Sequence, residues 1–289
     1  WSSDVCSSDL ITSWSRKEVI PTVEKFGGTL WYAVPYEGFE ASDHVVYTHA
    51  CPNQHLLPLL DWVMPAQGRR AYLVGSNYIW GWEINRLARE TLHAVGGEVL
   101  GERYLPIGSV DIGRMIEEIR ATEPDFILNS LIGPSSYAFL KAYAALGADD
   151  PRFSPDHCPV LSCNLTECEL DDIGAASEGL IAAGPYFHDG AQAFVSSHEA
   201  AANAAVYTLA NLLEGAEENS RLHIAALLQT PAGLQSRIDA KTHHMPQPVL
   251  IAQVRNGAFR VVHSGGLVAG DPYLSQPVPN AMRRLRVVS

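Results

Sequence analysis

Aromatic and hydrogen-bonding side chains recur in this sequence where short apolar runs end. The most distinctive stretch is residues 32–40, YAVPYEGFE, which follows an apolar run at residues 29–31 and turns at Gly38. The side chains found in such positions are Tyr32, Tyr36, Tyr78, Trp80, Trp82, Ser130 and Asn164. Loops that follow parallel strands meet at one edge of a sheet, so these side chains can line one crevice. Aromatic walls with few polar groups predict a site for a small, neutral, planar ligand.

Catalytic patterns are absent from the sequence. It contains no G-x-S-x-G elbow, no G-x-x-x-x-G-K-[ST] phosphate loop and no G-x-G-x-x-G fingerprint. His198 and Glu199 begin an H-E-x-x-H pattern, but Ala202 stands where the second histidine would be. The sequence therefore favours a binding protein over a hydrolase of the same ligands.

Thiols and paired histidines are the remaining candidates for a metal site. Cys158, Cys163 and Cys168 are spaced by five, whereas paired zinc ligands are usually two to four residues apart. His243 and His244 are adjacent, so on an extended segment they point opposite ways, and we expect a solvated turn. We predict no metal and no cofactor. Unpaired cysteines are typical of a reducing compartment, which favours the cytoplasm.

Composition excludes several function classes. The 289 residues carry a formal net charge of −12, which leaves no basic face for nucleic acid. No apolar run reaches the roughly 18 residues of a membrane span, so we expect no membrane insertion. The length fits two lobes better than one compact domain.

Strand and helix signals alternate through most of the chain. An S-x-x-E capping box at residues 15–18 predicts a helix start, with Ser13 just outside it. A second capping box is predicted from Thr166 to Glu169. Further predictions are strands at 45–47, 71–74, 99–104, 126–128, 160–163 and 180–183, loops at 75–82 and 129–135, and helices at 55–64 and 83–95. Such alternation predicts βαβ units and a parallel sheet throughout.

The last third of the chain has a different pattern. A long Ala-rich helix is predicted at 197–213. Two β-rich runs at 249–254 and 259–263 flank Asn256-Gly257, the sequence typical of a tight hairpin turn.

Several motifs carry a family resemblance. They are Ser13-Trp14-Ser15-Arg16-Lys17, YAVPYEGFE, Cys51-Pro52-Asn53-Gln54, GSNYIW at 75–80, Gly184-Pro185-Tyr186-Phe187 and Thr242-His243-His244. In this combination the chain resembles the type I periplasmic-binding-protein family. Within its amide- and urea-binding branch, the chain is most similar to the amide sensors and negative regulators of bacterial amidase operons. The resemblance implies an α/β fold of two lobes, each a mostly parallel sheet flanked by helices.

The resemblance and the order of elements predict a domain layout. The family begins with further strand and helix units that this sequence lacks, so we expect the N-terminal strands of lobe one to be missing. The expected parts are a foreign junction at 1–10, lobe one at 11–50, lobe two at 51–185, a return to lobe one at 186–238, final strands of lobe two at 239–270 and a tail at 271–289.

The resemblance also implies ligand contacts at particular positions. These are Ser13, Tyr32, Val34, Pro35, Tyr78, Trp80, Ser130, Leu131 and Asn164. Val34 stands where the amide sensor has a hydroxyl residue, and Trp80 where it has tyrosine. A lost hydroxyl hydrogen bond costs about 0.5 to 1.5 kcal/mol, so we expect a ligand larger or less polar than acetamide.

The function implied is a non-enzymatic protein whose lobes close on a short aliphatic amide or urea-like ligand. As a cytoplasmic regulator of amidase expression, it would have an antiterminator-type protein as its partner. The alternative is the periplasmic substrate-binding component of a urea or short-chain amide ABC transporter, whose partner is a permease. The sequence does not decide whether the protein forms a homo-oligomer.

Overall fold

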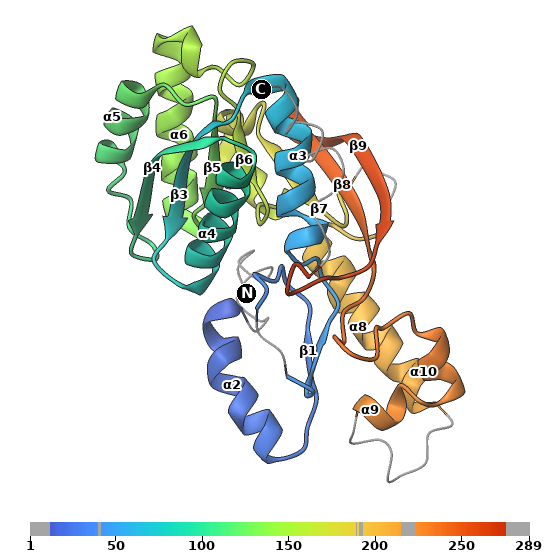
Figure 1. Cartoon of the computed structure of the whole chain (residues 1–289). Coiled ribbons are helices and arrows are strands. Elements are labelled where there is room, and N and C mark those ends of the chain that lie inside the picture. Colours follow the sequence, from blue (N-terminus) through green and yellow to red (C-terminus); the bar gives the residue numbers. More distant parts are fainter. Residues whose placement is uncertain (1–11, 40–41, 189, 191–192, 215–223, 276–289) are drawn as a thin grey trace.

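The computed structural model describes residues 12–39, 42–188, 190, 193–214 and 224–275, and it forms two lobes of unequal size (Figure 1). This confirms the predicted two-lobe α/β fold. The predicted junction at 1–10 and most of the predicted tail lie outside the described residues. Among the described helices, none is both long and apolar enough to cross a membrane.

The large lobe is built on a seven-stranded sheet of order β4-β3-β5-β6-β7-β8-β9. Its strands are β3 (Arg70–Ser76), β4 (Glu98–Leu105), β5 (Phe126–Ser130), β6 (Val160–Ser162), β7 (Ile181–Gly184), β8 (Gln247–Arg255) and β9 (Ala258–Val268). Neighbouring strands from β4 to β7 are parallel, whereas β8 and β9 are antiparallel. The expectation of a parallel sheet throughout is therefore wrong at this edge, because β8 runs antiparallel to β7 and the hairpin then turns the chain back into β9.

Helices cover both faces of this sheet. They are α3 (Leu56–Gln67), α4 (Ile79–Ala94), α5 (Gly113–Thr122), α6 (Gly133–Asp149) and the short α7 (Leu170–Ile173). Tyr72 and Val74 pack with α5 and α6, and the alternate residues Ala71 and Leu73 pack with α3 and α4. Because successive strand residues point to opposite faces, this alternation gives the lobe two apolar cores.

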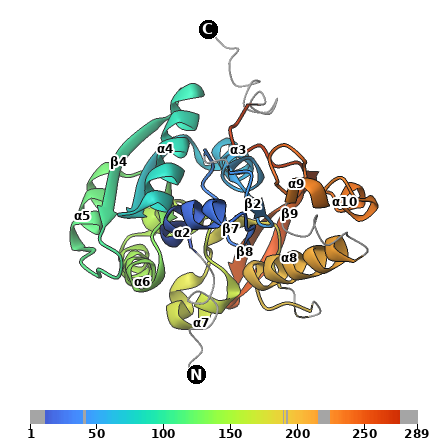
Figure 2. The same cartoon turned by 90° about the horizontal axis from the view of Figure 1, so that it is seen from below.

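The small lobe contains the parallel pair β1 (Leu30–Tyr32) and β2 (Val45–Tyr47). Its helices are α2 (Ser13–Lys25), α8 (Ser197–Leu213), α9 (Ile224–Leu227) and α10 (Pro231–Gln235). Seen from below, α2 lies centrally, with α4 and α6 to one side and α8 to the other (Figure 2). Val46 packs with Leu212, Ile224 and Ile238. Distant parts of the chain thus build one core.

The chain segments that join the lobes are held together by side-chain amides. Gln54, in the 3-10 helix η1 (Pro52–Gln54), donates from Nε2 to the Val268 carbonyl at 2.8 Å. Gln247 donates from Nε2 to the Thr48 carbonyl at 2.8 Å. These bonds join chain segments about 200 residues apart where the lobes meet.

Three predictions of local structure are confirmed. The hairpin turns at Asn256 and Gly257, whose φ values of 54° and 73° suit the left-handed conformation of a tight turn. Helix α8 has the predicted bounds. The second capping box also forms, with Thr166 N donating to Glu169 Oε2 at 2.6 Å.

Helix starts were predicted too late at three places. Helix α2 begins at Ser13, before the expected capping box, and α4 begins at Ile79 instead of residue 83. Helix α6 begins at Gly133, inside the predicted loop 129–135. At α4 the cause is packing: Gly81 sits so close to β3 that an added Cβ would lie 2.2 Å from the Ser76 carbonyl oxygen.

The expectation of a solvated turn at His243 and His244 is wrong. Both side chains are buried, and His244 stacks on Tyr47 with ring centroids 4.2 Å apart. Backbone bonds also join this segment to β2, from Tyr47 N to the His243 carbonyl and from Met245 N to the Tyr47 carbonyl. Residues 243–245, expected in lobe two, thus lie alongside the small lobe's strand.

Candidate functional site

A cavity of about 360 Å³ lies between the two lobes. The large lobe contributes loops and helix starts that follow β3, β4, β5 and β6, and the small lobe contributes the starts of α2 and α8 and the loop after β1. The lining residues are Thr12, Ser13, Val34, Pro35, Tyr78, Trp80, Ile107, Ile132, Gly133, Pro134, Tyr137, Asn164, Thr166, Cys168, Glu169, Asp172 and His198. The cavity therefore lies at the carboxyl edge of the parallel strands, where open α/β sheets bind ligands.

Of the described long helices that begin at this cavity, α8 is capped by the side chain of Ser196, and three others have no such cap. These three are α2, α4 and α6, whose N-cap residues are Thr12, Tyr78 and Ile132. In the described structure, none of these three N-cap side chains bonds to the helix that it precedes. First-turn N–H groups and the positive ends of the helix dipoles therefore border the cavity. This environment favours a ligand oxygen that accepts hydrogen bonds.

The small-lobe wall is fixed by a buried polar cluster. Ser13 Oγ donates to Glu37 Oε2 at 2.8 Å, and Glu37 also pairs with Arg16. Because the one Ser13 proton goes to Glu37, the Tyr32 hydroxyl is the donor in its 3.2 Å contact with Ser13 Oγ. Burial raises the pKa of Tyr32, so its hydroxyl keeps this proton. The Ser13 hydroxyl is thus held in one orientation at the cavity.

The large-lobe wall is aromatic. Tyr78 lies against Trp14 of α2, with ring centroids 6.4 Å apart, so the two lobes touch here. The Trp80 side chain is buried, and its indole Nε1 has no hydrogen-bond partner among the described residues. A donor left unpaired in this way is available to a ligand acceptor.

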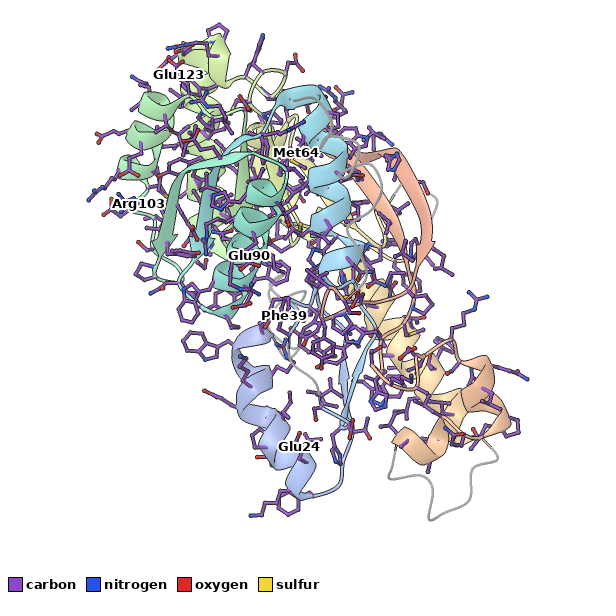
Figure 3. The ribbon with its side chains drawn as sticks, in the orientation of Figure 1. Glu24, Phe39, Met64, Glu90, Arg103 and Glu123 are labelled. Carbon is purple, nitrogen blue, oxygen red and sulfur yellow. The ribbon has the colours of Figure 1, made fainter. Side chains whose placement is uncertain are left out.

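A second contact joins the lobes at the edge of the cleft. The Arg86 guanidinium of α4 lies over the ring of Phe39, 4.8 Å from its centroid. Phe39 follows β1, and Figure 3 shows it between the top of α2 and the lower end of α4. Together with the pair of Trp14 and Tyr78, this contact holds the described conformation with the lobes together.

Ionisable groups on the cavity wall are acidic or neutral. Burial raises the pKa of Glu169 to about 7, although Thr166 N and Oγ1 both donate to its carboxylate. Burial lowers the pKa of His198 to about 4, so its imidazole is neutral at pH 7. No lysine or arginine is among the described lining residues. The described residues also contain no cluster of three or more His, Cys, Asp or Glu side chains suited to a metal ion.

Six of the nine residues predicted to contact ligand lie on the cavity wall. They are Ser13, Val34, Pro35, Tyr78, Trp80 and Asn164. The other three stand behind the wall. Tyr32 supports Ser13, Ser130 is the buried last residue of β5, and Leu131 packs in the core while its carbonyl accepts from Asn164 Nδ2 at 3.2 Å.

Two aromatic residues expected in the crevice are not on the wall. Tyr36 is fully buried in the small-lobe core, and Trp82 is exposed, with its indole nitrogen donating to Asn77 Oδ1. The early start of α4 explains Trp82, because a helix turns residues 80 and 82 to different sides.

Several wall residues were not predicted from the sequence. Thr166 and Glu169 could have been found, because their capping box comes just after Asn164, at the end of the same strand. Tyr137 and His198 lie on helices, and their approach to the cavity depends on how those helices dock. We see no local signal in the sequence that would have found them.

The family model for the periplasmic binding protein domain matches residues 9–226. The chain belongs to the periplasmic binding protein family. Among solved structures, a solute-binding protein of an ABC transporter from Rhodopseudomonas palustris HaA2, in complex with p-hydroxybenzoic acid, has a TM-score of 0.72 and 20% sequence identity. That comparison covers 91% of this chain and 78% of the other.

Two further solved structures have the same fold. A branched-chain amino acid ABC transporter protein from Thermus thermophilus, with bound valine, has a TM-score of 0.68 at 13% identity, covering 95% of this chain and 78% of that one. A solute-binding protein from R. palustris, in complex with benzoate, has a TM-score of 0.69 at 15% identity, covering 88% and 76%. These likenesses support the two-lobe fold of this periplasmic binding protein, and not the narrower amide-sensor branch.

Proposed function

We propose that this periplasmic binding protein is the solute-binding component of an ABC importer for a short-chain amide or urea-like solute. The observation that carries the proposal is the cavity between the lobes, which combines helix N-termini with acidic side chains. The transporter part is supported by the solved structures of similar fold, whose names describe ABC transporter proteins. Under this proposal the partner is a membrane permease and the location is the periplasm.

The polarity of the wall supports an amide. A carbonyl oxygen suits the N–H groups at the starts of α2, α4 and α6. The amide NH₂ group, which donates hydrogen bonds, suits acceptors such as Asn164 and Glu169. A carboxylate such as benzoate meets no lysine or arginine among the described lining residues and faces Asp172 and Glu169 instead, the latter partly ionised at pH 7. An uncharged solute avoids this repulsion.

The size of the cavity supports a longer amide than acetamide. A volume of about 360 Å³ falls at the lower end of the range for small-molecule pockets. The apolar side chains of Val34, Ile107 and Ile132 line it together with the aromatic rings. We therefore propose an aliphatic chain of several carbons on the solute, in agreement with the departure at Val34.

The regulator of amidase expression remains a second proposal. It is supported by the combined motifs PYEGFE, PNQ and GSNYI, which resemble the amide sensor. It places the protein in the cytoplasm with an antiterminator-type partner. Fractionation of cells that produce the protein from its native gene separates the two proposals: recovery in the periplasm rejects the regulator, and recovery in the cytoplasm rejects the importer.

Calorimetric titration tests the ligand class. Acetamide, butyramide, urea, benzoate and valine are titrated into the protein while ammonia release is followed. We expect butyramide to bind most tightly, with no ammonia released. If benzoate or valine binds and none of the amides does, the ligand class is wrong. Ammonia release that disappears in a single-residue variant would show an enzyme.

A further inference from the structure

A second and much smaller cavity adjoins the main one. Its volume of about 10 Å³ is close to that of one water-sized group. Pro35, Asn164 and Thr166 line both cavities, so the small one opens next to the solute site. His49 and Glu167 line only the small cavity. Neither residue belongs to the motifs that first indicated a ligand site.

His49 lines this small cavity and carries a hydrogen-bond donor that is unpaired within the described structure. Its side chain is 2% exposed, and its Nδ1 accepts from the Ala50 N–H at 2.8 Å. In a neutral ring the proton must then be on Nε2. Burial, with smaller effects of His198 and His55, lowers the pKa of His49 well below its ordinary value, so the ring is neutral. Nε2 is buried and has no partner among the described residues.

Glu167 offers an acceptor. Its Oε1 accepts from the His188 N–H at 2.6 Å, which fixes the carboxylate. Its Oε2 is buried and, within the described structure, accepts no hydrogen bond. A buried polar atom left unpaired costs about 1 to 3 kcal/mol, so two such atoms on residues that line one cavity need an explanation.

We propose that His49 and Glu167 form a subsite that binds one hydroxyl group of the solute. A hydroxyl accepts from Nε2–H and donates to Oε2, so it satisfies both atoms, and it fits a cavity of this size. The proposal rests on the solute-binding function and deepens it, because it predicts a solute with a second polar group. The chemical class is a short hydroxylated amide.

Matched ligand pairs test this subsite. The pairs are butyramide with 4-hydroxybutyramide, valine with threonine, and benzoate with 4-hydroxybenzoate, each measured by calorimetry. In whichever pair binds, we expect the hydroxylated member to bind at least tenfold more tightly to the wild-type protein. We expect Glu167→Gln, which conserves volume but replaces an acceptor oxygen, to abolish most of this preference.

Two controls separate the subsite from a general effect. Ser13→Ala removes a hydroxyl from the main cavity, so it should weaken both members of a pair alike. His49→Phe removes the donor and should abolish the same preference as Glu167→Gln; a thermal melt of each variant shows that it is folded. A resident water would satisfy both atoms without the solute, and Glu167→Gln would then shift both members equally.

The outcomes distinguish the subsite from the proposed function. If a pair binds but the wild type shows no preference, or Glu167→Gln shifts both members equally, the subsite is rejected and solute binding stands. If no pair binds but acetamide or urea does, the subsite is rejected and the proposed function stands; if none of these solutes binds, both are rejected. Loss of the preference in Glu167→Gln and His49→Phe, with folding retained, supports the subsite.

Discussion

Arg16 and Glu37 form a buried ion pair behind the cavity wall, with Arg16 Nη2 2.5 Å from Glu37 Oε1 and side chains 0% and 1% exposed. The Arg16 guanidinium also lies over the rings of Tyr32 and Tyr36, 4.6 and 4.8 Å from their centroids. Glu37 in turn accepts from Ser13. One charged pair therefore joins α2, β1 and the residues after it to the solute site.

Replacing one member of this pair should destabilise the protein strongly. Arg16→Met leaves Glu37 as an uncompensated buried charge, and we expect a loss of about 3 to 5 kcal/mol in the free energy of unfolding. Denaturant unfolding measures it. Glu123→Gln is the control, because it weakens an exposed ion pair on the outer side of the large lobe and should cost under about 1 kcal/mol. Equal losses in both variants would contradict the interpretation.

Tyr78 should contribute more to solute affinity than a tyrosine that lies outside the cavity. It lines the cavity and contacts Trp14 of the other lobe, so Tyr78→Ala removes ligand contact and weakens the closed form together. We expect butyramide affinity to fall at least tenfold, measured by calorimetry. Tyr207→Ala, on the exposed side of α8, is the matched control and should leave affinity within twofold.

Gly81→Ala should displace the start of α4. The added methyl group would meet the Ser76 carbonyl oxygen at 2.2 Å, so the helix must shift where Tyr78 and Trp80 line the cavity. Overpacking of this kind costs about 1 to 3 kcal/mol, and we also expect weaker solute binding. At Gly113 an added Cβ meets nothing within 4 Å, so Gly113→Ala should change neither property for the worse. Unchanged binding in Gly81→Ala would show that this helix start does not position the site.

Stability should fall in acid because of buried histidines. Burial lowers the pKa of His244 to about 4, whereas the unfolded chain has a value near 6.5. Between these values the unfolded state binds more protons, so stability is fully present above pH 6.5 and is lost as pH falls through 4. His244→Phe keeps the stacking on Tyr47. Between pH 7 and 4, the free energy of unfolding of this variant should fall by roughly 3 kcal/mol less than that of the wild type.

Denaturant midpoints at several pH values measure this dependence. His55 has a pKa lowered to about 4 by the same cause, so the variant should keep part of the slope. His263→Gln, in an exposed position on β9, is the control for losing a histidine. An identical slope in wild type and His244→Phe would contradict the assignment.

Local sequence signals were enough to predict some elements and not others. Asn256-Gly257 fixes a hairpin by backbone conformation alone, and Thr166 with Glu169 satisfies backbone donors within four residues. The prediction from the capping box at residues 15–18 was wrong, because the start of α2 is set by a partner outside the helix. Glu37 binds both Ser13 and Arg16.

The same distinction applies to the site. Wall residues that follow strands, such as Tyr78 and Asn164, could be placed because parallel strand ends converge. His198 and Tyr137 reach the wall through the docking of whole helices, which no short pattern encodes. The burial of His244 against Tyr47 likewise depends on two segments that are about 200 residues apart.

The core around Val46 has a consequence for folding order. Its partners Leu212, Ile224 and Ile238 come more than 160 residues later, so β2 cannot complete its packing during synthesis until the last third of the chain has been made. The large lobe has most of its parallel strands by residue 184. Contacts between such distant residues slow folding, because a long loop must close first. We therefore expect the small lobe to fold last, because β1 and β2 pack against helices that are synthesised much later.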